Sequence, residues 1–155
     1  MVGGKTMEII VSKCDTVNKN NIMYPLKEMK KCVSAFNKLS QKNSKRCVYY
    51  SRMPDSQHPE FTLGKIKKLK IKDGTVYADF EFSDNDWAKS AKEFYDEYIS
   101  KGVSSSHFDF RIMMDVAANL EPHTCSHFED KDISYQSAKD IEVYRFVFGL
   151  DSCWR

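Results

Sequence analysis

The chain has 155 residues and a mass of 18.0 kDa, which favours a single domain large enough to bury a core without disulfides or metals. Hydrophobic residues make up 41% and charged residues 30% of the sequence, as in ordinary soluble proteins, and no apolar run is long enough to cross a membrane as a helix. The formal net charge of +2 gives no reason to expect nucleic acid or an anionic membrane as a partner, so neither is predicted.

The N-terminus and the cysteines indicate where the protein is found. The sequence MVGGKTMEIIV lacks a long apolar segment with a small-residue cleavage site, so it is not a secretory signal. Residues 1–6 are rich in glycine, and we expect them to form a flexible leader to a single domain within 1–155. Five cysteines without a CxxC pair predict free, buried thiols in a reducing compartment, so we expect a cytoplasmic protein.

The first predicted elements are a strand and an amphipathic helix. Residues 7–15 (MEIIVSKCD) favour a strand, and the polar stretch 16–25 favours a loop. Pro25 suits the start of a helix, because its fixed φ and missing N–H cost nothing there. Apolar residues then recur three and four positions apart, which places them in one stripe on a helix. They are Leu26, Met29, Val33, Phe36 and Leu39.

The clearest local pattern is a β-hairpin between residues 63 and 84. Two alternating runs are joined by Asp73-Gly74, a dipeptide typical of tight two-residue turns. The lysines of GKIKKLKIKDG alternate with apolar residues, so we interpret them as the solvent-facing side of a strand and not as a phosphate-binding stripe. Before the hairpin, KRCVYYSRM predicts a strand, and PDSQHPEF predicts a loop because it contains two prolines.

A second amphipathic helix is predicted after the hairpin, in DWAKSAKEFYDEYISK. Asp84 or Asn85 can cap its N-terminus, and Gly102 suits its C-terminal cap. Its apolar residues lie at helical spacing. We therefore expect Trp87 and Phe94 to pack in the core, together with Phe80 of the hairpin, and not to line a ligand cage.

The remaining sequence predicts three more strands. The first begins in the serine stretch and runs through FDFRIMMDV, and the other two are CSHFEDKDISY and IEVYRFVFGLD. A loop, AANLEPHT, is expected between the first two. The whole pattern favours an α+β fold, with a mostly antiparallel sheet or barrel of about six or seven strands and two helices.

One group of polar residues can carry chemistry. A serine hydroxyl becomes an effective nucleophile only when a neighbouring base takes its proton, and a third group usually orients that base. The stretch SKGVSSSHFDF places three serines directly after the second helix. His58 lies in the proline-flanked loop PDSQHPEF, where rigid strands can present a side chain. His107 is a poorer base for Ser104, because residues three apart on a strand lie on opposite faces.

The order of these motifs resembles that of the prohead maturation proteases of tailed bacteriophages, particularly of large myophages, which are similar to the herpesvirus assemblin class. In that family an N-x-N-G-R-x-Y-P segment opens the domain, a G-E-x-x-H-P loop carries the catalytic histidine, and a helix ends in G-V-S-S-R-G with the nucleophilic serine. The corresponding positions here are Asn18, Asn20, Tyr24, Pro25, His58, Pro59, Gly102, Val103, Ser104 and Ser105.

Three positions depart from the family's motifs. Asn21-Ile22 replaces its Gly-Arg, Asp55-Ser56 replaces its Gly-Glu, and Ser106-His107 replaces the Arg-Gly that follows the serines. The last change can alter the backbone N–H groups that stabilise an oxyanion. The alternative to a protease is therefore a non-catalytic structural or interaction protein of the virion that keeps this fold.

The resemblance implies a role for each site residue. Ser104 is the expected nucleophile, with Ser105 as the alternative, and His58 is the expected general base and acid. For the third, orienting residue we favour Asp151. Glu142 is an alternative, because other phage enzymes of this kind use an acidic residue on a late strand, and His127 and His123 are alternatives, because assemblin-like enzymes use a second histidine.

The resemblance also implies partners and location. The expected substrates are phage scaffold and capsid proteins, cut inside the immature shell in the host cytoplasm. Cleavage is expected after a glutamate in an aliphatic-x-Glu pattern. No cofactor and no metal are expected for this chemistry.

A zinc site is the other use that the histidines suggest. In PHTCSHF, His123, Cys125 and His127 alternate, so on a strand all three project from one face, and imidazole with thiolate suits Zn²⁺. A structural zinc site normally has four ligands, and Asp130 or Cys153 would have to complete it. We therefore favour a strand with a half-exposed polar face over a metal site.

Overall fold

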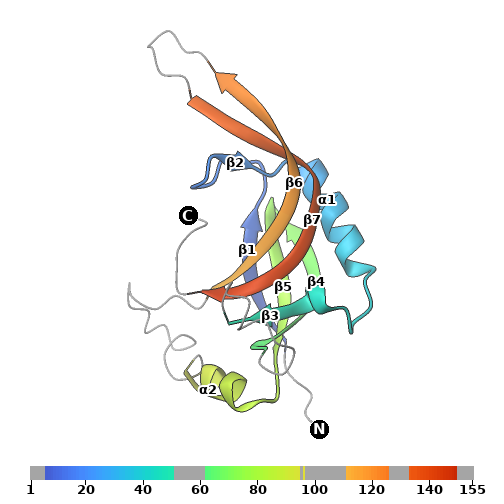
Figure 1. The fold of residues 1–155 in the computed structure, drawn as a ribbon, viewed down its shortest axis with the longest axis vertical. Coiled ribbons are helices and arrows are strands. Elements are labelled where there is room, and N and C mark those ends of the chain that lie inside the picture. The colour runs from blue at the N-terminus through green and yellow to red at the C-terminus, as the bar shows by residue number, and fades with distance from the viewer. Residues whose placement is uncertain (1–5, 51–61, 95, 97–110, 126–132, 150–155) are drawn as a thin grey trace.

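A computed structural model describes residues 6–50, 62–94, 96, 111–125 and 133–149 of the chain. These residues contain seven strands and two α-helices, which confirms the predicted α+β fold (Figure 1). The strands are β1 (Met7–Lys13), β2 (Ile22–Met23), β3 (Cys47–Tyr49), β4 (Gly64–Lys72), β5 (Thr75–Phe82), β6 (Arg111–Cys125) and β7 (Ile133–Gly149). The helices are α1 (Leu26–Asn37) and α2 (Asp86–Phe94), and a short 3₁₀ helix covers Ser44–Arg46.

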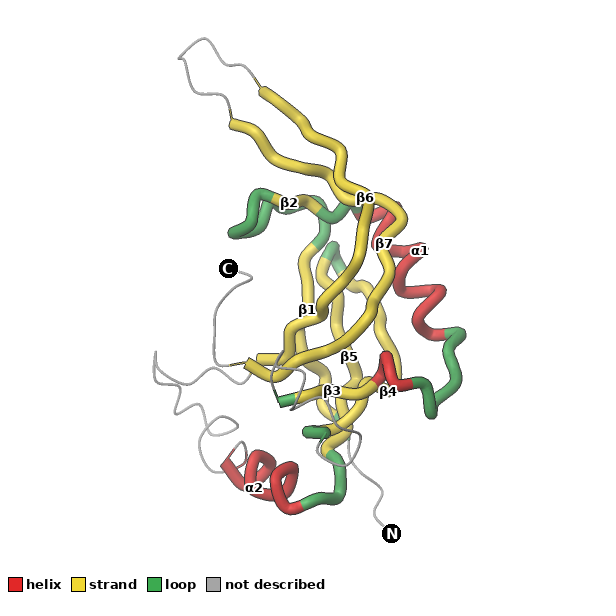
Figure 2. The backbone as a smooth tube through the Cα atoms, viewed as in Figure 1, coloured by secondary structure: helices red, strands yellow, loops and turns green. Residues whose placement is uncertain are grey.

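The strands form one curled sheet in the order β1-β5-β4-β3-β7-β2, and β6 pairs with β7 along its length. Most neighbours are antiparallel, whereas β7 is parallel to both β2 and β3. Figure 2 shows how β6 and β7 curve around the other strands, so that the sheet forms a half-barrel. The upper part of the β6–β7 hairpin projects from the body of the molecule.

The hairpin of β4 and β5 has the predicted turn. Asp73 and Gly74 adopt φ values of 50° and 75°, and two consecutive positive φ angles match the strand twist of a two-residue hairpin. One face of β5 lies in the core, because Val76, Ala78 and Phe80 are completely buried, which confirms the expected burial of Phe80.

The lysines of β4 are exposed or half-buried, as expected for a solvent-facing side, and two of them pair with acidic residues of neighbouring strands. Lys70 Nζ lies 2.7 Å from a carboxylate oxygen of Glu8 on β1 and 3.1 Å from one of Asp79 on β5. Lys72 Nζ lies 3.1 Å from Glu8. The hydrogen bond from Lys70, followed by that from Lys72, lowers the pKa of the Glu8 carboxyl. Because these pairs are exposed, they add little to stability.

Helix α1 packs between β4 and β7. The short strand β3 joins these two strands over only part of their length, and the helix covers the gap beyond it. The ring of Phe36 meets that of Phe146 edge to face, with 5.6 Å between centroids. Asn37 takes the place of a strand partner for β4: its amide donates to the Leu69 carbonyl oxygen and accepts from the Leu69 N–H, both at 2.9 Å. The buried stripe of the helix largely follows the sequence prediction. It consists of Met29, Cys32, Val33 and Phe36.

The side chain of Arg46 joins α1 to β4 from inside the protein. It is only 1% exposed, and its guanidinium donates hydrogen bonds to six backbone carbonyl oxygens. The C-terminal carbonyls of a helix lack partners and carry partial negative charge, so a cation there is stabilising. The acceptors are the carbonyl oxygens of Phe36, Asn37, Leu39, Ser40, Ile66 and Lys67.

The C-terminal half differs from the sequence prediction. The expected loop AANLEPHT is wrong, because β6 continues through it and pairs with β7 as far as Cys125. The expected strand CSHFEDKDISY is wrong as a unit, since Cys125 ends β6 and Ile133 begins β7; residues 126–132 lie outside the described ranges. Pro122 had indicated the loop, but a proline without an N–H is tolerated on an edge strand such as β6. The predicted loop at 16–25 likewise contains the short strand β2.

The predicted leader falls mostly on residues 1–5, which are not among the described residues. Across the helices that the structure describes, none combines the length and apolar character that crossing a bilayer requires.

Candidate active site

Several strand ends that flank the predicted site residues lie at one end of the sheet. β3 runs parallel to β7, with Tyr49 opposite Val147, so both strands finish there. β6 starts at the same place, with Arg111 opposite Gly149. β4 begins and β5 finishes there as well. Figure 1 shows α2 below these strand ends, and we call this region the α2 end of the sheet.

The predicted catalytic residues belong to segments that leave or enter the sheet at the α2 end. His58 lies between β3 and β4, Ser104 and Ser105 precede β6, and Asp151 follows β7. All four fall outside the described residues, so their roles remain predictions. What the structure describes is the set of strand ends to which these segments connect.

The alternatives for the third residue lie away from the α2 end where the structure describes them. Glu142 lies in β7, seven residues before Gly149, which corresponds to roughly 23 Å along a strand. Its carboxylate is exposed and lies 2.7 Å from Lys45 Nζ, a contact that lowers its pKa. His123 lies in the projecting part of β6, opposite Tyr135. Neither the His123 side chain nor His127 is among the described parts.

The same gap applies to the zinc hypothesis. Within the described parts of the chain, no group of three or more histidine, cysteine or acidic side chains could hold a metal ion. The side chains of His123 and Cys125, and the whole of His127, are outside those parts. The preference for a polar strand face therefore remains a prediction.

Asn85 connects the start of α2 to the chain that follows residues 51–61. Its side-chain oxygen accepts from the Ala88 N–H at 2.8 Å, which confirms one of the two predicted N-caps. Its amide nitrogen donates to the Thr62 carbonyl oxygen, also at 2.8 Å. Thr62 is buried, and its hydroxyl lies 2.9 Å from that of Ser83. The N-terminus of α2 is thus fastened to the last turn before β4.

A second contact joins α2 to the chain that precedes residues 51–61. The ring of Trp87 lies 5.7 Å from that of Tyr50, centroid to centroid. The predicted burial of Trp87 is wrong: the side chain is 63% exposed, because Ala88, which is fully buried, takes the inward position and lets the helix approach closely. The side chain of Phe94 is not described, whereas Phe80 is buried as expected.

The hydroxyl of Tyr50 is buried, and no described residue hydrogen-bonds to it. Burial raises the pKa of Tyr50 to about 12, so the side chain is neutral at physiological pH. No local sequence pattern indicates the pairing of Tyr50 with Trp87, because the two residues lie in different predicted elements with the hairpin between them. Only the return of the chain to the α2 end brings them together.

Neither a protein-family model nor a curated protein sequence matches the chain. Among solved structures, the chain is similar to the capsid assembly protease gp21 of bacteriophage T4, with a TM-score of 0.57 and 18% sequence identity. The match covers 96% of this chain and 87% of that chain. At this level of identity the likeness is one of fold, and it agrees with the fold that the order of sequence motifs implied. The chain therefore has a fold similar to that of a phage capsid assembly protease.

Proposed function

We propose that the protein is a serine endopeptidase that cleaves scaffold and capsid proteins during procapsid maturation of a tailed bacteriophage. The observation that carries this proposal is the convergence, at the α2 end, of the strand ends that flank His58, Ser104 and Asp151. The similarity in fold to a phage capsid assembly protease supports it, as does the order of the sequence motifs. The protein would act inside the immature shell, in the host cytoplasm.

The segments that connect His58, Ser104 and Asp151 to the sheet are long enough for the three side chains to meet. His58, Ser104 and Asp151 are four, seven and two residues from the nearest described residues, Thr62, Arg111 and Gly149. An extended chain spans at most about 3.6 Å per residue, so the connections reach at most about 14, 25 and 7 Å. Such reach suffices to bring three segments to one place when their anchors share one end of a sheet.

In the proposed mechanism, the Ser104 hydroxyl attacks the carbonyl carbon of the scissile peptide bond while His58 takes the hydroxyl proton. The tetrahedral intermediate collapses when His58 passes that proton to the leaving amine, which breaks the C–N bond and leaves an acyl ester on Ser104. Water, deprotonated by His58, then hydrolyses the ester. Asp151 accepts a hydrogen bond from the other ring nitrogen and fixes the imidazole tautomer. In the assemblin-like variant, a second histidine takes this place.

The test is cleavage of the phage's own scaffold and major capsid proteins by wild-type protein, Ser104→Ala and His58→Ala. Ser100→Ala is the matched control, because it removes a hydroxyl from the same stretch but precedes the matched motif. We expect equal rates for wild type and the control, and a loss of at least about 10³-fold for the other two. Cleavage that survives both catalytic substitutions contradicts the mechanism. A loss in Ser105→Ala but not in Ser104→Ala would move the nucleophile by one position.

A non-catalytic virion protein is the second candidate function, favoured by the replacement of Arg-Gly with Ser106-His107 beside the serines. A fluorophosphonate probe separates the two, because it labels an activated serine whether or not the correct substrate is present. Labelling of Ser104 that disappears in His58→Ala supports the protease. Unlabelled wild-type protein that also fails to cleave capsid or scaffold proteins supports the structural role.

A further inference from the structure

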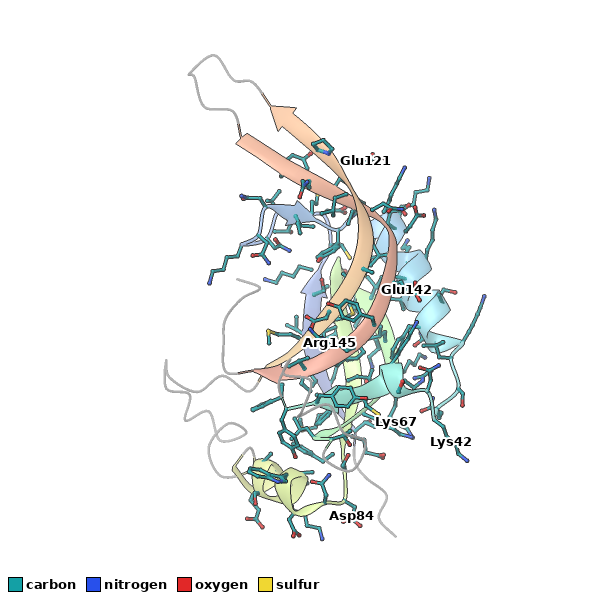
Figure 3. All side chains as sticks on the ribbon, in the orientation of Figure 1. Lys42, Lys67, Asp84, Glu121, Glu142 and Arg145 are labelled. Carbon is teal, nitrogen blue, oxygen red and sulfur yellow. The ribbon has the colours of Figure 1, made fainter. Side chains whose placement is uncertain are left out.

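Helix α2 lies beyond the end of the sheet (Figure 1). Its first turn is held there by the buried Ala88 and by contacts among four further residues. They are Tyr50, Thr62, Asn85 and Trp87, and we call them the α2 clamp. Figure 3 shows Asp84, next to this first turn, far from Glu142 in the middle of β7. The clamp is therefore local to the α2 end.

The two halves of the α2 clamp hold opposite ends of one segment. Tyr50 is the last described residue before residues 51–61, and Thr62 is the first described residue after them. Trp87 contacts the former through its ring, and Asn85 bonds the carbonyl of the latter. Thr62 is itself fixed, because it is 7% exposed and bonded to Ser83. The start of α2 thus touches both ends of the segment that contains His58.

Asn85 uses both ends of its amide, and only one of them is needed for the helix. The oxygen caps α2, a role that aspartate or serine fills equally well. The nitrogen donates to the Thr62 carbonyl, and aspartate has no donor for that bond when it is ionised. An amide at position 85 is therefore required for the contact with the His58 segment and not for the helix.

We propose that Asn85 is a positioning residue, which sets the place of α2, and of the serine-bearing segment that follows it, relative to the segment that carries His58. The inference rests on the proposed function, because it assigns the clamp a role in bringing base and nucleophile together. Misplacement of reacting groups by about 1 Å can lower a rate about 10²-fold even when the changed residue touches no substrate. Loss of the Thr62 bond is therefore expected to reduce kcat by about 10- to 100-fold with little change in KM.

The test compares Asn85→Asp and Asn85→Ser with wild type. Both variants keep an oxygen for the Ala88 N–H. Ionised aspartate has no donor for the Thr62 carbonyl, and the serine hydroxyl is on a shorter side chain that no longer reaches it while it caps the helix. Asn37→Asp is a matched control, because Asn37 also donates its amide to a strand carbonyl, that of Leu69, on the other side of the molecule. We expect kcat on capsid or scaffold substrate to fall in both Asn85 variants and to stay within two-fold of wild type in Asn37→Asp. Thermal unfolding, measured in parallel, is expected to show similar losses for Asn37→Asp and Asn85→Asp.

A second measurement reads the clamp without any enzymatic activity. Ring-to-ring NOE contacts between Tyr50 and Trp87 are expected in wild type and Asn37→Asp, and weakened in both Asn85 variants, because α2 is then free to shift. Unchanged NOE contacts in the Asn85 variants would refute the clamp. Weakened contacts with kcat unchanged would refute its positioning role. If wild-type protein neither cleaves nor reacts with the fluorophosphonate, the proposed function fails, while the NOE result still decides whether Asn85 positions α2.

Discussion

Arg46 completes the hydrogen bonding of two elements at once, and its buried cation faces carbonyl groups from both. Because β3 is short, β4 has an unpaired edge beyond it, where the register shift between Ile66 and Lys68 turns carbonyls toward α1. Three of the six carbonyl oxygens also have a second donor, since Phe36 accepts from the Leu39 N–H, Ser40 from the Asn43 N–H and Lys67 from the Gln41 amide, so Arg46 adds a charged donor to them. The ring of Phe36 lies 4.7 Å from the guanidinium carbon and covers its face.

Replacement of Arg46 by methionine is expected to lower the free energy of unfolding by about 3 kcal/mol or more, because six carbonyl oxygens lose a charged donor together and an apolar side chain takes its place. Urea denaturation followed by circular dichroism measures this loss. Arg46→Lys is expected to recover little, since an ammonium group cannot reach six acceptors in the plane of a guanidinium. Lys45→Met is the control: it removes the exposed ion pair with Glu142, with a change of about 0.5 kcal/mol. Equal effects at positions 45 and 46 would contradict this role of Arg46.

At the scale of elements, the long β6–β7 hairpin bends where its register shifts, near Asp140. Asp140 has a φ of 54°, a left-handed conformation that few residues other than glycine, asparagine and aspartate adopt. Its N–H donates to a carboxylate oxygen of Glu28 in the first turn of α1, at 3.1 Å, and its carboxylate accepts from Asn119 at 2.8 Å. The bond from Asp140 is the main cause that lowers the pKa of Glu28. This bend fastens α1 to the hairpin.

Substitution at Asp140 tests whether the bend requires a left-handed residue. Asp140→Val is expected to lower the free energy of unfolding by about 2 kcal/mol, because a β-branched side chain is strained at positive φ. Asp140→Gly keeps the conformation without strain and loses only an exposed hydrogen bond, so a change of about 1 kcal/mol or less is expected. Chemical denaturation of both variants gives the comparison. A valine variant as stable as the glycine variant would show that the bend relaxes.

Sequence patterns predicted the β4–β5 hairpin and missed the β6–β7 hairpin, because only the first is marked by local residues. The β4–β5 hairpin can be recognised from its own residues. Asp73-Gly74 forms the turn, and the alternation of apolar and polar residues shows which side of each strand is buried. In β6, Pro122 and the polar residues around it break the alternation, although the strand continues because β7 supplies its hydrogen bonds. Pairing with β7, which is distant in sequence from the start of β6, therefore outweighs the weak strand propensity of these residues.

At the scale of the whole molecule, the pattern of elements in the sequence predicted the fold class. The residues of the candidate site were predicted from short motifs alone, without any information on where they meet. The apolar stripe of α1 fixed its buried face, since Met29 and Phe36 need only helical periodicity to be recognised. Arg46 could not be recognised as buried, because its six acceptors come from two stretches of chain that lie far apart in the sequence, residues 36–40 and residues 66–67. The convergence at the α2 end was equally hidden, since it depends on β7 lying parallel to β3.

Stability as a whole is expected to decline in alkaline solution. Burial raises the pKa of the Cys32 thiol from 9.0 to about 11, and that of Tyr50 to about 12. Above the pKa of each group in the unfolded chain, the unfolded state loses a proton that the folded state keeps, so unfolding becomes more favourable as pH rises. This contribution is therefore complete below about pH 9 and is lost between about pH 9 and pH 12.

Urea denaturation at a series of pH values from 8 to about 11 measures the decline. Cys32→Ala removes one of the two groups, so its free energy of unfolding is expected to fall by roughly 2 kcal/mol less than that of wild type over this range. The lower starting stability of the variant, caused by the lost side chain, does not affect the slope. Parallel pH profiles for the two proteins would contradict the assignment to Cys32.

The place of β7 near the end of the described chain has a consequence for synthesis on the ribosome. This strand pairs with β2, β3 and β6 and supplies Phe146 to the core beside α1. Until β7 has been synthesised, β2 and β3 lack their parallel partner, and α1 lacks the strand against which Phe36 packs. Contacts between such distant parts of a chain form late and slowly. A nascent chain therefore cannot assemble the α2 end before β7 has left the ribosome, and any activity of a site at that end begins only afterwards.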